Sequence, residues 1–341
     1  MPRLAPLGLV LLIGALTSTE SAAVSRPPPV VGRWNLAVTA ADGSTFPSWL
    51  ELTFDTKTGV LAGRLCGRYG KPRPLAKSEW KKNELFLVES AADAADKEVS
   101  AAGGKEAPAG EAKAEPSAPP APAPRSYRAK IRFGNLEGTA EAAGEPTWTI
   151  FGTRPPKFHE RGRVAWGKPV PLVSRGLIGW RLRDNRHGTC WKETAGVLES
   201  RPDCVDIVSD GRYQDFKLHL EVKLPPGGAT GVFLRGRYQV QLADDAGKPP
   251  TDETSGGIYG LISPRKNAAG KAGQWQTLDV TLVGRKVTVM LNGQLAIDNQ
   301  EIIGPTGGAI DADEAIPGSI LLEAEKGPLA FRNMVVTPAL W

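Results

Sequence analysis

In the stretch Gly231-Val-Phe-Leu-Arg-Gly-Arg-Tyr-Gln-Val-Gln-Leu242, apolar and long polar side chains alternate. Successive side chains of a β-strand point to opposite faces, so a period of two predicts a strand with one buried face and one polar face. Read as a single strand, the apolar face carries Val232, Leu234, Tyr238, Val240 and Leu242. The opposite face carries Phe233, Arg235, Arg237, Gln239 and Gln241.

The same alternation recurs on both sides of this stretch. It extends over residues 216–222 and 287–291, and Asn292-Gly293 is a strong signal for a tight hairpin turn. No segment keeps a helical period over three turns. Short strands separated by glycine-rich turns predict an all-β fold, with a two-sheet sandwich in the C-terminal part.

The polar face of the 231–242 stretch has the side chains that a sugar-binding surface needs. Guanidinium and amide groups hydrogen-bond to hydroxyls, and the ring of Phe233 offers a flat apolar surface for a pyranose. The alternative is a solvated outer face, and the spacing alone leaves both interpretations open.

The length of 341 residues predicts two domains. Period-two runs predict a small antiparallel β-barrel or sandwich at residues 30–157, followed by a second domain at 170–341. Inside the first domain, residues 90–125 are rich in Ala and Pro and contain no aromatic side chain. Such a segment buries too little apolar surface to offset its ordering entropy, so a disordered insertion is predicted there.

The N-terminus has the pattern of a signal peptide at residues 1–23. Arg3 precedes an apolar run at 7–16, and Ser21-Ala22-Ala23 fits a small-residue cleavage site. The apolar run is shorter than the ~20 residues of a membrane-spanning helix, and no later segment reaches that length. No cysteine stands at the cleavage site, as a bacterial lipid anchor would require. The sequence therefore predicts a periplasmic or secreted protein without a transmembrane segment.

The charge balance argues against a nucleic-acid partner. The chain has 42 Lys and Arg against 37 Asp and Glu, a net charge of +5, and the basic residues do not gather in one segment. Three His and three Cys argue against a histidine-rich or thiolate metal site, so no metal ligand and no cofactor are assigned. The segment Asp311-Ala-Asp313-Glu314 has the oxygen ligands that calcium takes, but it lacks the length and glycine of a calcium loop, and an ordinary acidic turn is favoured.

Two further features are left open by the sequence. Cys190 and Cys204 are close enough to pair, and Cys66 lies far from both, but the pairing cannot be deduced from spacing. His219 alternates with apolar residues, which favours an exposed strand position over a catalytic one.

Eight short motifs follow one another along the second domain. They are Gly179-Trp180, Gly196-Val-Leu198, Tyr213-Gln-Asp-Phe-Lys-Leu-His-Leu-Glu221, Gly231-Val-Phe-Leu-Arg-Gly-Arg-Tyr238, Gly257-Ile-Tyr-Gly260, Gly273-Gln-Trp-Gln276, Leu291-Asn-Gly293 and Phe331-Arg-Asn333. In this order and spacing, residues 172–338 resemble the 3-keto-disaccharide hydrolase domain family. The resemblance implies a concanavalin A-like jelly-roll sandwich and an enzyme that acts on 3-keto-glycosides. The N-terminal β-domain lies outside it.

The chain departs from the usual pattern of that family at three places. Family members usually have Asn-Ser where this chain has Ala229-Thr230, and Tyr-Glu-Val-Gln where it has Tyr238-Gln-Val-Gln241. They tend to have Leu-Gln-Gly-Asp-His-Gly where this chain has Leu322-Glu-Ala-Glu-Lys-Gly327. A carboxylate has become an amide, an amide a carboxylate, and an imidazole an ammonium, so this copy is predicted to be altered or inactive if the chemistry uses those groups.

The resemblance implies a reaction that begins with removal of the C2 proton beside a C3 ketone, continues with loss of the C1 substituent, and ends with addition of water. It needs a base, a group that polarises the ketone and an acid near the leaving oxygen. Arg235 or Arg237 is assigned to the ketone, and Glu323 or Glu325 to the base. The residues assigned to substrate binding are Phe233, Arg237, Gln239, Gln241, Tyr259, Trp275 and Lys326.

Three functions stay open. The first is an exported hydrolase or lyase-type hydrolase of 3-keto-glycosides, with a carbohydrate as its partner. The second is a non-catalytic carbohydrate-binding module of the same fold. The third is an interaction module of the cell envelope. The competing interpretation of Glu323 and Glu325 is surface charge beside Lys326. A carboxylate at position 239 is expected to lie beside guanidinium groups and stay ionised. Gln239→Glu is therefore expected to raise activity by about 10²–10⁴-fold if the family's glutamate is the base, and to leave turnover within a few-fold if that glutamate only orients substrate. The sequence does not predict an oligomeric state.

Overall fold

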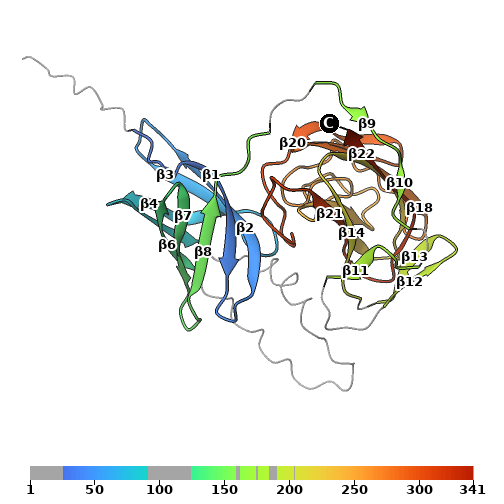
Figure 1. Cartoon of the computed structure of the whole chain (residues 1–341), viewed down its shortest axis with the longest axis horizontal. Helices are drawn as coiled ribbons and strands as arrows, with labels where there is room; N and C mark the ends of the chain where they lie inside the picture. Colours follow the sequence, from blue (N-terminus) through green and yellow to red (C-terminus); the bar gives the residue numbers. More distant parts are fainter. Residues whose placement is uncertain are drawn as a thin grey trace, which may run out of the picture.

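A computed structural model describes residues 26–90, 124–158, 162–173, 176–183, 190–202 and 204–340. The predicted signal peptide, most of the predicted insertion (91–123), His159 and His187 lie outside these residues. Every regular element in the described part is a β-strand, so the predicted all-β class is confirmed. Figure 1 shows a barrel beside a larger two-sheet sandwich.

The first eight strands close into an antiparallel barrel in which β8 pairs back onto β1. The sequence left a barrel and a sandwich open, and the barrel is what forms. Its strands are β1 (Gly32–Thr39), β2 (Thr45–Phe54), β3 (Leu61–Cys66), β4 (Arg73–Lys81), β5 (Glu84–Glu89), β6 (Ser126–Arg132), β7 (Asn135–Glu141) and β8 (Trp148–Thr153).

The interior of the barrel is filled by the apolar half of each alternation. Trp34, Leu36 and Val38 of β1 point inward with Leu50 and Leu52 of β2. Closure leaves no strand edge unpaired, which is one way in which small β-proteins avoid edge-to-edge association. Cys66 is buried and unpaired, and burial raises the pKa of its thiol to about 12.

The remaining strands build two packed sheets. The nine-stranded sheet consists of β9 (Ala165–Trp166), β10 (Val170–Pro171), β12 (Trp191–Thr194), β13 (Val197–Ser200), β15 (Phe216–Lys223), β18 (Trp275–Val283), β19 (Lys286–Leu291), β20 (Gln294–Glu301) and β22 (Ala330–Leu340). The five-stranded sheet has the order β11 (Trp180–Leu182), β14 (Ile207–Tyr213), β21 (Gly318–Leu322), β16 (Ala229–Leu234) and β17 (Tyr238–Ala243). This is the concanavalin A-like sandwich that the sequence predicts.

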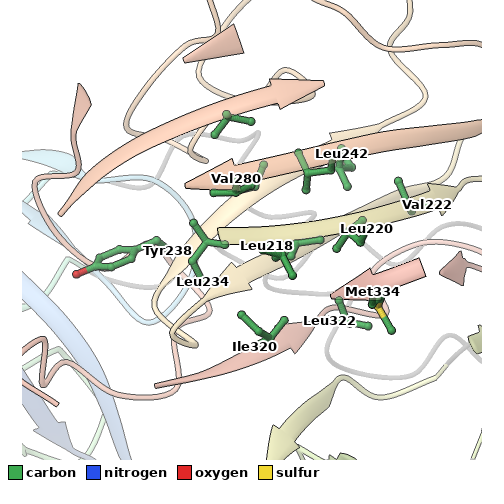
Figure 2. Close-up of a cluster of buried hydrophobic side chains, with 14 of the residues drawn as sticks. Leu218, Leu220, Val222, Leu234, Tyr238, Leu242, Val280, Ile320, Leu322 and Met334 are labelled. Carbon is green, nitrogen blue, oxygen red and sulfur yellow. The ribbon is translucent and has the colours of Figure 1, made fainter. Parts of the chain in front are cut away.

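One apolar core lies between the two sheets. Figure 2 shows Leu218, Leu220 and Val222 of β15 among side chains of the opposite sheet such as Leu234 and Leu322, and all are buried. The ring of Tyr238 lies at one end of this cluster, with its hydroxyl pointing away from the aliphatic side chains. The inward set predicted for the 231–242 stretch is therefore confirmed.

The outward set of that stretch is only partly as predicted, because the stretch is a hairpin and not one strand. β16 ends at Leu234, which pairs with Tyr238 at the start of β17. Arg235 and Gly236 adopt positive φ angles of 56° and 66° and turn the chain. A glycine adopts such angles at little cost, which is why the turn falls here. The two arginines therefore leave the strand face that the single-strand interpretation gave them.

The barrel and the sandwich share a buried polar interface. Trp49 of the barrel is buried and donates from Nε1 to the carbonyl oxygen of Pro305 at 2.7 Å. Glu314 is fully buried and accepts from Arg33 and from Asn35 of the barrel, the latter at 3.1 Å. Its other oxygen accepts from the Tyr238 hydroxyl at 2.6 Å. Segment 302–317 thus lies between the two units and is bonded to both.

The structure also determines the cysteine pairing of the sandwich. Cys190 and Cys204 form a disulfide, with Cα atoms 5.5 Å apart, which settles the pairing that the sequence left open. In the part of the chain that the structure describes, no helix has the length and apolar character needed to cross a membrane.

Candidate functional site

Four side chains meet on the outer face of the five-stranded sheet. Gln239 and Gln241 come from β17, where they alternate with the core residues. Glu323 and Glu325 follow directly after β21 and alternate in the same way. We call these four residues the Gln–Glu quartet. The strand order β21-β16-β17 brings them together across β16.

Hydrogen bonds connect the four residues into one network. The Gln239 Nε2 atom donates to Oε1 of Gln241 at 2.7 Å and to Oε2 of Glu323 at 3.2 Å. The Gln241 side chain in turn bonds to Glu325. Each amide therefore holds one carboxyl group, and both amides are almost fully buried. Glu323 is half-buried and Glu325 is exposed at the edge, so the network opens to solvent at its carboxyl end.

The surroundings raise the pKa of both carboxyl groups. For Glu323, desolvation is the largest cause, followed by the nearby negative charges of Glu325 and Asp206, and the pKa lies well above its ordinary value. For Glu325 the pKa is also raised by desolvation, against the opposing effects of Gln241 and Lys326. A carboxyl group with a raised pKa holds its proton to a higher pH than usual, and carboxyl groups with perturbed pKa values cluster at functional sites.

Gly231 makes room for this network. It lies on β16 between the two pairs, and a Cβ atom there would be 2.6 Å from Oε2 of Glu323 and 2.7 Å from Nε2 of Gln239. Only a residue without a side chain allows the carboxyl group and the amide to meet above the strand.

Replacing Gly231 by alanine should therefore separate Glu323 from Gln239 without unfolding the sheet. The atoms that would clash are the ends of flexible side chains, so we expect the free energy of unfolding to change by less than about 1 kcal/mol. If these side chains are catalytic groups, a displacement of about 1 Å costs about 100-fold in rate, and a loss of that order is then expected. Gly162→Ala, which meets no atom within 4 Å, is the matched control. Urea unfolding checks the expected stability, and initial rates on the same preparations check the expected loss of activity. An unaltered rate would show that activity does not need the contact between Glu323 and Gln239.

Two residues at the site carry no signal in the sequence. Asp206 accepts from the backbone N–H of Ala324 at 3.0 Å and pairs with Arg183 at 3.0 Å. It therefore fixes the segment that carries Glu323 and Glu325. The positive charge of Arg183 lowers the pKa of Glu323 and partly opposes desolvation. They come from a loop and the end of β11, where no periodicity predicts their direction.

The structure places the two predicted arginines away from the quartet. The Arg235 guanidinium is fully buried and bonds to Asp215 at 2.8 Å and to the carbonyl oxygen of Gly284 at 2.7 Å. Arg237 is equally buried and bonds to Asp311 at 2.6 Å. Both lie at the turn of the hairpin, several residues from Gly231, and their charges are already neutralised by carboxylates.

Two predicted aromatic residues also lie elsewhere. Phe233 shares the outer face with Gln239 but is fully buried, and a Cβ atom added to Gly308 would lie 3.1 Å from Cζ of its ring. Trp275 is on β18 of the other sheet, between the cationic groups of Lys223 and Arg332 at 5.1 and 4.1 Å from its ring. Neither ring is available to a sugar bound at the quartet.

Tyr259 and Lys326 border the quartet. The backbone N–H of Tyr259 donates to the carbonyl oxygen of Gln239 at 3.0 Å, and Lys326 lies close enough to lower the pKa of Glu325. His219 pairs with Asp279 at 2.7 Å on the nine-stranded sheet, at the partly exposed strand position that the sequence favours. Among the described residues, no group of three His, Cys, Asp or Glu side chains is arranged to hold a metal ion.

Residues 171–337 match the model of the 3-keto-alpha-glucoside-1,2-lyase-like domain. The match confirms the resemblance found in the sequence and indicates a glycosyl hydrolase-like, carbohydrate-active protein.

Solved structures with a similar sandwich were also found. A candidate glycosyl hydrolase from Parabacteroides distasonis is 24% identical, with 53% of this chain and 93% of that chain covered and a TM-score of 0.43. A second candidate glycosyl hydrolase from the same organism is 25% identical, over 50% and 100% of the two chains, at a TM-score of 0.40. The carbohydrate-binding module CBM66 from Bacillus subtilis is 17% identical, over 48% and 98%, at a TM-score of 0.33. A search of curated proteins gave no match.

Proposed function

We propose that the protein cleaves 3-keto-glycosides, with Glu323 as the base. The observation that carries this proposal is the half-buried Glu323 carboxyl group, which is held by Gln239 and has a raised pKa. A base of that kind suits the weakly acidic proton beside a ketone, because proton transfer is most effective when the catalytic pKa approaches the working pH.

The quartet can supply the proton transfers of the reaction. Glu323 takes the proton from C2, and the electron pair of that C–H bond forms the enolate of the C3 ketone. The enolate collapses to a C1–C2 double bond, the C1–O bond breaks, and the leaving oxygen takes a proton from Glu325. Water then adds to C1 while Glu325 takes a proton from it, and Glu323 returns its proton to C2. Both carboxyl groups regain their starting states, and the sum is hydrolysis. Lys326 is the cation near Glu325 and is assigned to the developing oxyanion, whereas Arg183 is paired with Asp206 and acts on the pKa of Glu323.

The altered residues of this copy support retained activity. The family usually has a carboxylate at position 239 and an amide at 323, and this chain has the reverse. These two side chains are in contact at 3.2 Å. The two changes together therefore keep one amide and one carboxyl group in the same small volume, with the carboxyl group moved from β17 to the end of β21. Glu325 replaces the shorter aspartate and keeps its carboxyl group.

The same contact corrects the expectation for Gln239→Glu. A carboxylate at 239 would lie beside Glu323, not among guanidinium groups, because Arg237 is bonded to Asp311. We expect the single change to lower activity, since two adjacent carboxylates resist joint ionisation.

The raised pKa of Glu323 predicts the pH profile. A base must be ionised, so kcat/KM should rise with pH through a midpoint above the ordinary glutamate value of about 4.3. Rates measured from pH 4 to 8 on a 3-keto-disaccharide check this, with Glu199→Gln on β13 as an exposed control. A midpoint at or below the ordinary value would show that Glu323 is not the base.

The direct test is product release. Purified protein should release monosaccharide from a 3-keto-disaccharide and none from the same disaccharide with a hydroxyl at C3, because only the ketone acidifies C2. Equal action on both would favour an ordinary two-carboxylate glycosidase. Binding of both without release would favour the second candidate, a carbohydrate-binding module of this fold.

We also propose that the protein works outside the cytoplasm. The signal-peptide pattern supports this, and so does the Cys190–Cys204 disulfide, since such bonds persist in oxidising compartments. Mass spectrometry of exported protein should find Val24 as the first residue.

A further inference from the structure

The loop that joins β3 to β4 of the barrel, Arg68–Lys71, lies against the sandwich beside the quartet. We propose that this loop forms a sugar-binding subsite in which Tyr69 stacks on a hexose unit next to the one that is cleaved. The proposal deepens and rests on the proposed function, and it gives the barrel a part in substrate recognition.

The first line of contact runs through residues 306–308, which lie between this loop and the five-stranded sheet. The backbone N–H of Gly308 donates to the carbonyl oxygen of Arg68 at 2.9 Å. A Cβ atom on Gly307 would lie 2.4 Å from the carbonyl oxygen of Gly70, so the two backbones touch. The preceding residue, Thr306, accepts through Oγ1 from the backbone N–H of Gln239 at 3.0 Å. Residues 306–308 therefore connect the loop to Gln239 of the quartet by backbone contacts and hydrogen bonds.

The second line of contact is made by Lys71. Its ammonium group pairs with Glu253 at 2.8 Å and with Asp252 at 3.3 Å. Its side chain also packs on Gly260, whose Cβ position would be 2.7 Å from Cγ of Lys71. Gly260 follows Tyr259, which donates to Gln239. With consecutive Cα atoms 3.8 Å apart, the two lines of contact place the loop within about 12 Å of Gln239.

The loop presents the chemistry of a sugar platform. Tyr69 is 47% exposed, although it lies in a loop anchored at both ends. The guanidinium of Arg68 lies 5.2 Å from its ring and 5.4 Å from the ring of Phe46, so the cation supports the tyrosine against the barrel. An exposed aromatic ring that is held in place, with a guanidinium beside it, offers a flat apolar surface and hydrogen-bond donors together. A neutral oligosaccharide is the ligand class that uses both.

The experiment compares binding and turnover in the full-length protein. Calorimetric titration with gluco-oligosaccharides of two to six units is carried out on wild type, Tyr69→Ala and the control Phe133→Ala, whose ring is fully exposed at the distant β6–β7 turn. We expect Tyr69→Ala to bind the longer oligosaccharides about tenfold more weakly and Phe133→Ala to match wild type. On a 3-keto-oligosaccharide, Tyr69→Ala should raise KM with kcat unchanged, as expected for lost uniform binding.

Binding by Tyr69→Ala within about twofold of wild type would overturn the subsite, and so would the absence of binding by wild type to every oligosaccharide tested. Weaker binding by Tyr69→Ala in a protein that releases no sugar from 3-keto substrates would support the subsite and overturn the proposed catalytic function instead. The two failures are therefore distinguishable.

Discussion

Replacement of Glu323 by glutamine should reduce kcat on a 3-keto-disaccharide by about 10²–10⁴-fold, the contribution of a general base. The amide keeps the shape of the side chain and can accept a hydrogen bond from Gln239, but it cannot take a proton from C2. Glu199→Gln, an exposed change on β13, should leave the rate unaltered. Single-turnover measurements separate the chemical step from product release.

A double variant sharpens this prediction. Gln239→Glu combined with Glu323→Gln returns the carboxyl group to β17 and the amide to the end of β21, across the same 3.2 Å contact. If the carboxyl group is the base, the double variant should recover activity that each single variant loses. Additive losses would show that the two positions do not share one function.

Glu323→Gln is also expected to change the stability of the protein, which can be measured without substrate. Because the folded protein raises the pKa of Glu323, it binds this proton more tightly than the unfolded chain does. The free energy of unfolding therefore falls as pH rises from the unfolded to the folded pKa. Glu323→Gln should be more stable than wild type at neutral pH and lose that advantage near pH 4. Urea midpoints at both pH values check the sign, and a less stable variant at neutral pH would contradict it.

Replacement of Glu314 by alanine should destabilise the protein by about 3–5 kcal/mol, the cost of breaking a buried ion pair. The carboxylate is fully buried between barrel and sandwich and accepts from Arg33, Asn35 and Tyr238. Its loss leaves the Arg33 guanidinium almost buried and unpaired, with a pKa that burial already lowers to about 10. Equilibrium unfolding in urea measures the effect.

The control for this prediction is Glu301→Gln. Glu301 also pairs with an arginine near the interface, Arg285, but its side chain is 56% exposed, so we expect less than about 1 kcal/mol. A double-mutant cycle of Arg33→Ala and Glu314→Ala should give a coupling energy of about 0.5–3 kcal/mol. A coupling near zero would mean that the barrel and the sandwich are not held together through this pair.

The period-two alternation determined much of this protein from sequence alone. Residues that alternate apolar and polar have one stable arrangement, which is a sheet with its apolar face against another apolar surface. That rule predicted the all-β class and the inward set from Val232 to Leu242, whereas the resemblance to a family came from the ordered motifs of the second domain. It also placed Gln239 and Gln241 on the outer face, because both follow the alternation inside a single strand.

What the tertiary structure decided are the contacts between segments distant along the chain. The hairpin at Arg235-Gly236 turned two predicted site residues into buried structural ion pairs, since positive φ angles at the turn remove them from the strand face. The strand order β21-β16-β17 brought Glu323 to Gln239, and Gly231 left the space for them to meet. Alternation reports which way a side chain points but not which strand lies next to it. It therefore could not predict the roles of residues outside or at the ends of strands, which are Asp206, Arg183 and the Arg68–Lys71 loop.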